Sequence, residues 1–239
     1  MTISDLPDQR ELWVAAYKLI PSRQHKVSAF VETCLPLLAP NAQVLELGCG
    51  GGDDAEAFAQ AGHTVIATDF VTSLIERNRD RLDLPNLTFE TMRIDEPYPY
   101  PNASFDAVYA HLTLHYYRDA ETREIIREIR RVLRPGGWLM FACKSPQDPA
   151  WGKGEEIEPD MFNAHGKIRH FFRPDYAQSL LDDGFTDIRI ASHTGKLYRQ
   201  KSGWITAIAR TTTPQSATPP PGIYCGHIAD PDSNDRRTP

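Results

Sequence analysis

The sequence predicts one α/β domain, because short apolar runs alternate with helical patterns. The run Val44–Leu47 is followed by four glycines within five residues and then by a helix-forming segment. This order is typical of a buried strand, a tight turn and a helix. A second apolar run ends at Asp69, others cover 105–110 and 138–143, and residues 120–133 carry an amphipathic helical stripe. Alternation of this kind favours an α/β fold.

The composition argues against several classes of function. The 239 residues carry a net charge of −6, which argues against a nucleic-acid binder. The four cysteines are scattered and form no C-x-x-C pair, so we expect neither a disulfide framework nor a zinc site. No leader peptide is evident, and no apolar run approaches the ~20 residues of a membrane span. We expect a cytoplasmic monomer or homodimer with no membrane or nucleic-acid partner.

The glycine-rich turn predicts a nucleotide-type ligand. Glycines allow a sharp turn and close approach of a ligand to the backbone. A dinucleotide site of the form G-x-G-x-x-G would need a third glycine where Asp53 stands, and Asp53 and Asp54 would oppose a pyrophosphate. Glu46 lies in the strand just before the turn. These acids favour a ligand with cationic parts, such as S-adenosylmethionine, which has a sulfonium, an α-amino group and no phosphate.

The motif E-L-G-C-G-G-G at 46–52 resembles the first motif of class I S-adenosylmethionine-dependent methyltransferases. Asp69, the run 104–110 and the run 132–139 follow in that family's order, and the resemblance covers roughly residues 40–210. It implies a Rossmann-like, seven-stranded, mostly parallel sheet with helices on both faces and an antiparallel last strand. Around that domain, 41–210, we expect a helical cap over 1–40 and a mostly disordered tail over 211–239.

The resemblance, with the turn chemistry, gives a set of cofactor-binding residues. Glu46 and the backbone near Gly48 and Ala110 would hold the amino-acid part of the cofactor. One carboxylate, Asp69, can accept from both ribose hydroxyls; the alternative role for Asp69 is an N-cap for the helix near Val71. The complete set is Glu46, Gly48, Cys49, Gly50, Asp69, Phe70, Ile94 and Ala110.

The adenine side departs from the family pattern. Relatives usually place an Asp where Arg93 stands, and an arginine has no acceptor for the adenine amine. The backbone of Ile94 could still contact the adenine edge, and Asp95 could supply an acceptor instead. Phe70 would stack beside the adenine.

His111 and His115 follow the strand 105–110, where ligands of an open α/β sheet bind. If these residues form a helical turn, the two histidines share a face, and either could take a proton from a methyl acceptor. The alternative is that they hydrogen-bond locally and shape the site. The expected catalytic residues are His115 and His111, and the expected substrate-binding residues are Tyr17, His115, Tyr116 and His170.

Two further segments are expected to cover the site. Residues 8–20 and 22–38 predict two helices, with Ser22 as an N-cap, and they either line the site or pack on the core. Residues 144–172 are rich in proline, glycine and aromatic side chains, and we interpret them as an irregular substrate lid. A metal site built from His111, His115, His165 and His170 is conceivable, but we expect none.

The predicted function is methyl transfer from S-adenosyl-L-methionine to a small-molecule acceptor, in line with the sulfonium. The sequence has no Asn-Pro-Pro-Tyr-like motif, which counts against adenine or amide methylation. A thiol or metalloid methyltransferase and a non-catalytic S-adenosylmethionine-binding protein remain as alternatives. A nicotinamide oxidoreductase is disfavoured by the missing third glycine and by the acids around the turn.

Overall fold

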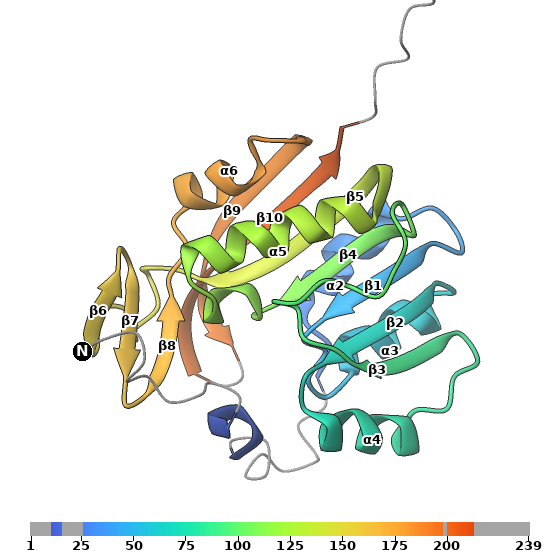
Figure 1. The fold of residues 1–239 in the computed structure, drawn as a ribbon, viewed down its shortest axis with the longest axis horizontal. Helices are drawn as coiled ribbons and strands as arrows, with labels where there is room; N and C mark the ends of the chain where they lie inside the picture. The colour runs from blue at the N-terminus through green and yellow to red at the C-terminus, as the bar shows by residue number, and fades with distance from the viewer. Residues whose placement is uncertain (1–10, 16–25, 198–199, 213–239) are drawn as a thin grey trace, which may run out of the picture.

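The computed structural model describes residues 11–15, 26–197 and 200–212. Its main sheet has seven strands in the order β3-β2-β1-β4-β5-β10-β9 (Figure 1). The strands are β1 (Gln43–Leu47), β2 (Thr64–Asp69), β3 (Leu87–Thr91), β4 (Phe105–His111), β5 (Leu133–Lys144), β9 (Phe185–Leu197) and β10 (Gln200–Thr211). Strands β1 to β5 are parallel to one another, and β10 is antiparallel to both β5 and β9. The predicted sheet, including its antiparallel last strand, is confirmed.

Helices cover both faces of this sheet, as predicted. They are α2 (Ala29–Cys34), α3 (Asp53–Gln60), α4 (Thr72–Arg81), α5 (Asp119–Val132) and α6 (Pro174–Leu181), with 3-10 turns η2 (Leu35–Leu37) and η3 (Leu114–Tyr116). Side chains alternate across β1, so Leu45 and Leu47 join the core under α5 and α6, whereas Val44 joins the core under α2 and α3. The two cores hold the strands in place, and the candidate site residues lie at and just after the ends of these strands.

Residues 155–170 form a second sheet, inserted between β5 and α6 (Figure 1). Its antiparallel strands are β6 (Glu155–Glu158), β7 (Met161–Ala164) and β8 (Lys167–His170). His165 and Gly166 turn β7 into β8 with positive φ angles of 53° and 85°. The prediction of an irregular stretch here is therefore wrong. The sequence did not reveal these strands because each is only four residues long and carries no clear alternation.

The N-terminal prediction is only partly testable. Residues 11–15 are helical, whereas Tyr17 and Ser22 lie outside the described residues. Residues 26–28 are not helical, and α2 begins after Ser28, whose hydroxyl accepts from the amide of Val31 at 3.3 Å. The predicted continuous helix over 22–38 is therefore wrong at 26–28, because Ser28 satisfies the free amides of a helix that starts later.

Most of the proposed tail, 213–239, also lies outside the described residues. Within the part of the chain that the structure describes, no helix is both long and apolar enough to cross a membrane.

Candidate active site

The turn between β1 and α3 needs its glycines. Gly48, Gly50 and Gly52 have φ angles of 71°, 52° and 79°, which side chains rarely adopt. A Cβ on Gly48 would lie 2.5 Å from the side chain of Thr113, and one on Gly52 would lie 2.9 Å from the ring of Phe89. The turn is therefore packed between the segment after β4 and the strand β3.

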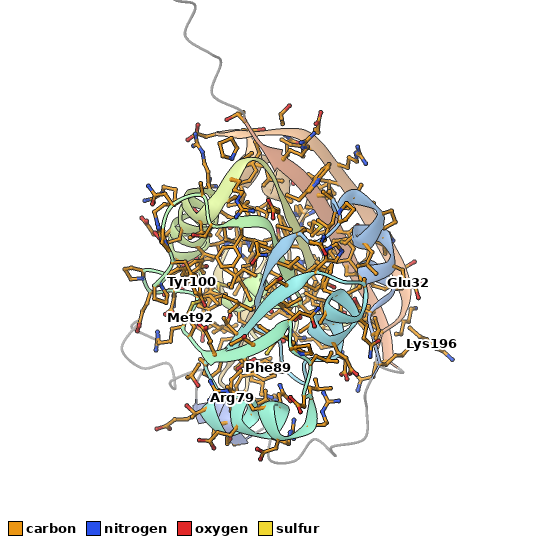
Figure 2. The ribbon with its side chains drawn as sticks, turned by 90° about the vertical axis from the view of Figure 1, so that its right-hand side faces the viewer. Glu32, Arg79, Phe89, Met92, Tyr100 and Lys196 are labelled. Atoms are coloured by element: carbon orange, nitrogen blue, oxygen red, sulfur yellow. The ribbon has the colours of Figure 1, made fainter. Side chains whose placement is uncertain are left out.

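Neighbouring elements hold this turn through its backbone. The side-chain amide of Asn78, fully buried in α4, donates to the carbonyl of Gly50 at 2.8 Å, and the amide of Cys49 donates to the carbonyl of Thr68 at 2.8 Å. Arg79 of α4 in turn donates to the carbonyl of Phe89 at 2.9 Å; Figure 2 labels both residues. Sequence reasoning missed Asn78, because it stands in a polar helix with no pattern that marks it as buried.

Asp69 ends β2 directly beside the turn. One carboxylate oxygen accepts from the amide of Gly50 at 3.1 Å, and the other accepts from the amide of Val71 at 3.0 Å. Burial raises the pKa of Asp69, and these two backbone donors oppose that shift. The alternative of a helix cap is not what the structure shows, because Val71 is itself the N-cap of α4 and Asp69 binds the amide of that residue. Each oxygen still has a lone pair for a further donor such as a ribose hydroxyl.

Glu46 is the buried acid of the site. Its Oε2 atom has no hydrogen-bond partner among the described residues. Burial, followed by the nearby charges of Asp54, Asp53 and Asp69, raises the pKa of Glu46 well above its ordinary value, and a backbone donor at Ala55 opposes this. A buried carboxyl with a free oxygen among other acids fits a cationic ligand. The donor set and the glycine cradle thus fit S-adenosylmethionine.

Asp54 has a different role from the one its sequence position suggests. Its carboxylate accepts from the amide of Ser28 at 2.7 Å and from the hydroxyl of Tyr109 at 2.8 Å. The Nδ1 atom of His111 lies 3.6 Å from the same carboxylate. Asp54 thus joins α2, α3 and β4, and sequence reasoning missed this because the partners are 26 and 55 residues away in the chain.

The two expected catalytic histidines do not lie on one helical face. His111 is the last residue of β4, Leu112 has a positive φ of 57°, and His115 sits in the 3-10 turn η3. The conditional prediction of a shared helical turn is wrong, because the left-handed residue reverses the chain between them. Burial lowers the pKa of His111, and Asp54 opposes that shift.

His115 is fully buried, and neither of its ring nitrogens has a partner among the described residues. Burial lowers its pKa well below the ordinary value, and the positive charges of Arg169 and Lys144 lower it further. The imidazole is therefore neutral at pH 7, and both of its nitrogens are available for a hydrogen bond with a ligand. It lies two residues after Thr113, which packs against Gly48.

The inserted sheet contacts the other expected substrate-binding residues. Tyr116 packs on His115 with ring centroids 4.3 Å apart and on Trp13 at 4.7 Å. His170 is buried in β8, with its ring 4.5 Å from that of Tyr176 on α6, and its Nδ1 atom has no partner within the described ranges. The structure thus brings Tyr116 and His115 together and places His170 against α6, while Tyr17 lies outside the described residues.

The adenine-side residues are arranged around an ion pair. Arg93 contacts Asp95, and its Nε atom lies 2.8 Å from a carboxylate oxygen of Glu96. Arg93 therefore neutralises the charges of Asp95 and Glu96, and the carboxylate of Asp95 is occupied by this ion pair. Ile94, which lies between Arg93 and Asp95, is buried. Phe70 follows Asp69 directly, and Ala110 is fully buried one residue before the end of β4.

The described residues contain no group of three or more His, Cys, Asp or Glu side chains arranged to hold a metal ion.

Comparison with known proteins finds methyltransferases. Residues 44–137 match the family model described as a methyltransferase domain. A ubiquinone/menaquinone biosynthesis C-methyltransferase of Ralstonia pickettii is 37% identical over 120 residues, 48% of this chain and 49% of the relative. An uncharacterized methyltransferase of Synechocystis is 33% identical over 100 residues, 42% of this chain and 46% of the relative. The chain spans about half the length of these relatives.

Solved structures share the fold. The 1,6-didemethyltoxoflavin-N1-methyltransferase of Burkholderia thailandensis, solved with that compound and S-adenosylhomocysteine, superposes with a TM-score of 0.63. It is 21% identical, and the match covers 85% of this chain and 87% of that one. With the strand order, the glycine cradle and the acid at the end of β2, these matches show that residues 44–137 form a methyltransferase domain and that the chain has the fold of S-adenosylmethionine-dependent methyltransferases.

Proposed function

We propose that the protein transfers the methyl group of S-adenosylmethionine to a small-molecule acceptor. The observation that carries this proposal is Glu46, whose buried and unpartnered oxygen faces a turn already crowded with acids. Such a site costs free energy without a cation and is relieved by one. A phosphate-bearing dinucleotide would meet only further like charge.

The cofactor would lie across the ends of β1, β2 and β4. Glu46, with the backbone of Gly48 and Ala110, would hold the cationic amino-acid part, and Asp69 would accept from the ribose hydroxyls. The backbone of Cys49 and Gly50 lines the cradle, because positive φ angles and the absence of Cβ atoms leave it accessible. Phe70 and the backbone of Ile94 would contact the adenine.

S-adenosylmethionine supplies an electrophilic methyl group, so the chain's main task is alignment of the acceptor. His115 lies two residues after Thr113, which packs against Gly48. Its imidazole is neutral, so it would be the group that takes a proton from an acceptor that arrives protonated. His111 is tied to Asp54 and shapes the wall beside it. The inserted sheet, which contacts η3 through Arg169 and Tyr116, would act as the lid that excludes water.

A small molecule is the acceptor that these features favour. The relatives include enzymes named for quinone and toxoflavin methylation, and the aromatic ring of Tyr116 in η3 lies beside His115. The three described cysteines are buried thiols, which supports a reducing, cytoplasmic setting.

A panel of small phenols, amines, thiols and carboxylic acids, with S-adenosylhomocysteine release as the readout, tests the proposal. Release with at least one acceptor and none without the protein is expected. Cofactor binding without turnover on any acceptor would instead indicate a non-catalytic binding protein.

A further inference from the structure

The strand β8 carries two basic side chains toward the site. Alternation along a strand puts Lys167 and Arg169 on one side of β8 and separates them from His170. The Nζ atom of Lys167 lies 5.2 Å from the ring centre of Trp13, and the guanidinium of Arg169 lies 5.9 Å from that of Tyr116. Because these two rings contact each other, both cations border one aromatic surface (Figure 1, where residues 11–15 lie beside β8).

Neither Lys167 nor Arg169 has a carboxylate partner in the described ranges, although other basic residues of this region do. Arg118 pairs with Glu158 at 2.8 Å, Arg173 pairs with Asp160, and Lys144 pairs with Asp148 at 2.9 Å. Glu158, Asp160 and Asp148 are thus engaged by other bases. The charges of Lys167 and Arg169 remain uncompensated by any described acid.

Arg169 is the more buried of the two and is directed to the site. Its guanidinium lies over the ring of Tyr116, and its Nε atom is buried without a partner among the described residues. The charge of Arg169 also lowers the pKa of His115 more than any other charged group does. A buried donor without a partner costs free energy, which a bound acceptor of hydrogen bonds would recover.

Resting on the proposed function, we propose that Arg169, with Tyr116 and His115, forms a subsite for an ionised oxygen of the methyl acceptor, so that the substrate is an organic anion. A guanidinium binds a carboxylate or an ionised phenol through charge-assisted hydrogen bonds. His115 supplies a neutral nitrogen donor or acceptor beside it. Lys167 adds a second positive charge nearby, on the ring of Trp13.

Benzoate is a suitable probe, and benzamide is its neutral counterpart. Their binding to the full chain is measured by NMR titration, with and without saturating S-adenosylhomocysteine. Benzoate is expected to bind more tightly than benzamide. Arg169→Gln is expected to lower benzoate affinity about tenfold or more, the scale of one charge-assisted contact, and to leave benzamide and S-adenosylhomocysteine unaffected.

Arg127→Gln is the matched control, because Arg127 is exposed on α5 and its substitution removes the same charge from the molecule. Arg169→Lys keeps the charge and should recover part of the benzoate affinity. Equal binding of benzoate and benzamide, undetectable benzoate binding, or an equal loss in Arg127→Gln would overturn the anion subsite. Failure of S-adenosylhomocysteine to bind would instead contradict the proposed function, while the comparison of benzoate with benzamide still decides the subsite.

Discussion

The amide of Gly50 donates to the carboxylate of Asp69 at 3.1 Å, so one acid both fixes the glycine turn and faces the expected ribose position. The second carboxylate oxygen accepts from Val71 at the start of α4. Three elements, β1, β2 and α4, thus depend on one side chain. We therefore expect cofactor binding and the shape of the turn to be coupled through Asp69.

Asp69→Ala should lower both S-adenosylmethionine affinity and the stability of the cofactor-free protein. The change leaves two backbone amides without partners, each at a cost of ~1–3 kcal/mol. Calorimetric titration and thermal unfolding measure the two effects. Asp80→Ala, the same change on the exposed side of α4, should alter neither. Unchanged cofactor affinity in Asp69→Ala would rule out the ribose contact.

Glu46→Gln should stabilise the cofactor-free protein at neutral pH and weaken S-adenosylmethionine binding. The raised pKa of Glu46 means that folding favours its protonated form, so its contribution to stability is present at low pH and is lost as pH rises through the folded-state pKa. The gain from Glu46→Gln should therefore grow between acidic and neutral pH, as followed by chemical unfolding at a series of pH values.

Glu32→Gln provides the control, because Glu32 is exposed on α2 (Figure 2). Binding of the cationic cofactor should also release a proton from Glu46, which calorimetry in buffers of different ionisation enthalpy detects. Proton uptake, or no difference between Glu46→Gln and wild type, would contradict the assignment of Glu46 to the cofactor's cationic part.

Gly48→Ala should destabilise the protein more than Gly62→Ala. Both glycines have positive φ angles, but a Cβ on Gly62 meets nothing within 4 Å, whereas one on Gly48 meets Thr113 at 2.5 Å. The difference between the two free energies of unfolding measures the contact with Thr113. Adding Thr113→Ala should recover part of the loss in Gly48→Ala only. Equal losses in the two glycine variants would show that the turn tolerates a side chain.

His115→Ala should lower turnover by about 10²–10⁴-fold, the range for loss of a general base, if the acceptor arrives protonated. Cofactor affinity should hold, because His115 lies beyond the turn. The lowered pKa keeps the imidazole neutral below the usual histidine range, so the acidic limb of the rate profile should fall below pH ~6.5.

His165→Asn, in the β7–β8 turn, is the control and should keep wild-type turnover, because asparagine tolerates the positive φ there. Wild-type turnover in His115→Ala would remove His115 from proton transfer.

The sheet could be predicted because its strands carry long apolar runs, and the cofactor cradle could be predicted because its glycines are adjacent in the chain. The small sheet at 155–170 could not, because its strands are too short to show a period. His111 and His115 were separated by Leu112, whose left-handed backbone has no sequence signature. Asn78 and Asp54 gain their roles from partners far along the chain, which local patterns do not encode.

Calorimetric titration of the purified protein with S-adenosylmethionine, S-adenosylhomocysteine and NADH tests the central claim most directly. The acids around Glu46 and the cradle at Gly48–Gly52 predict saturable binding of the first two and none of NADH. Binding of NADH in place of S-adenosylmethionine would contradict the account from the glycine turn onward.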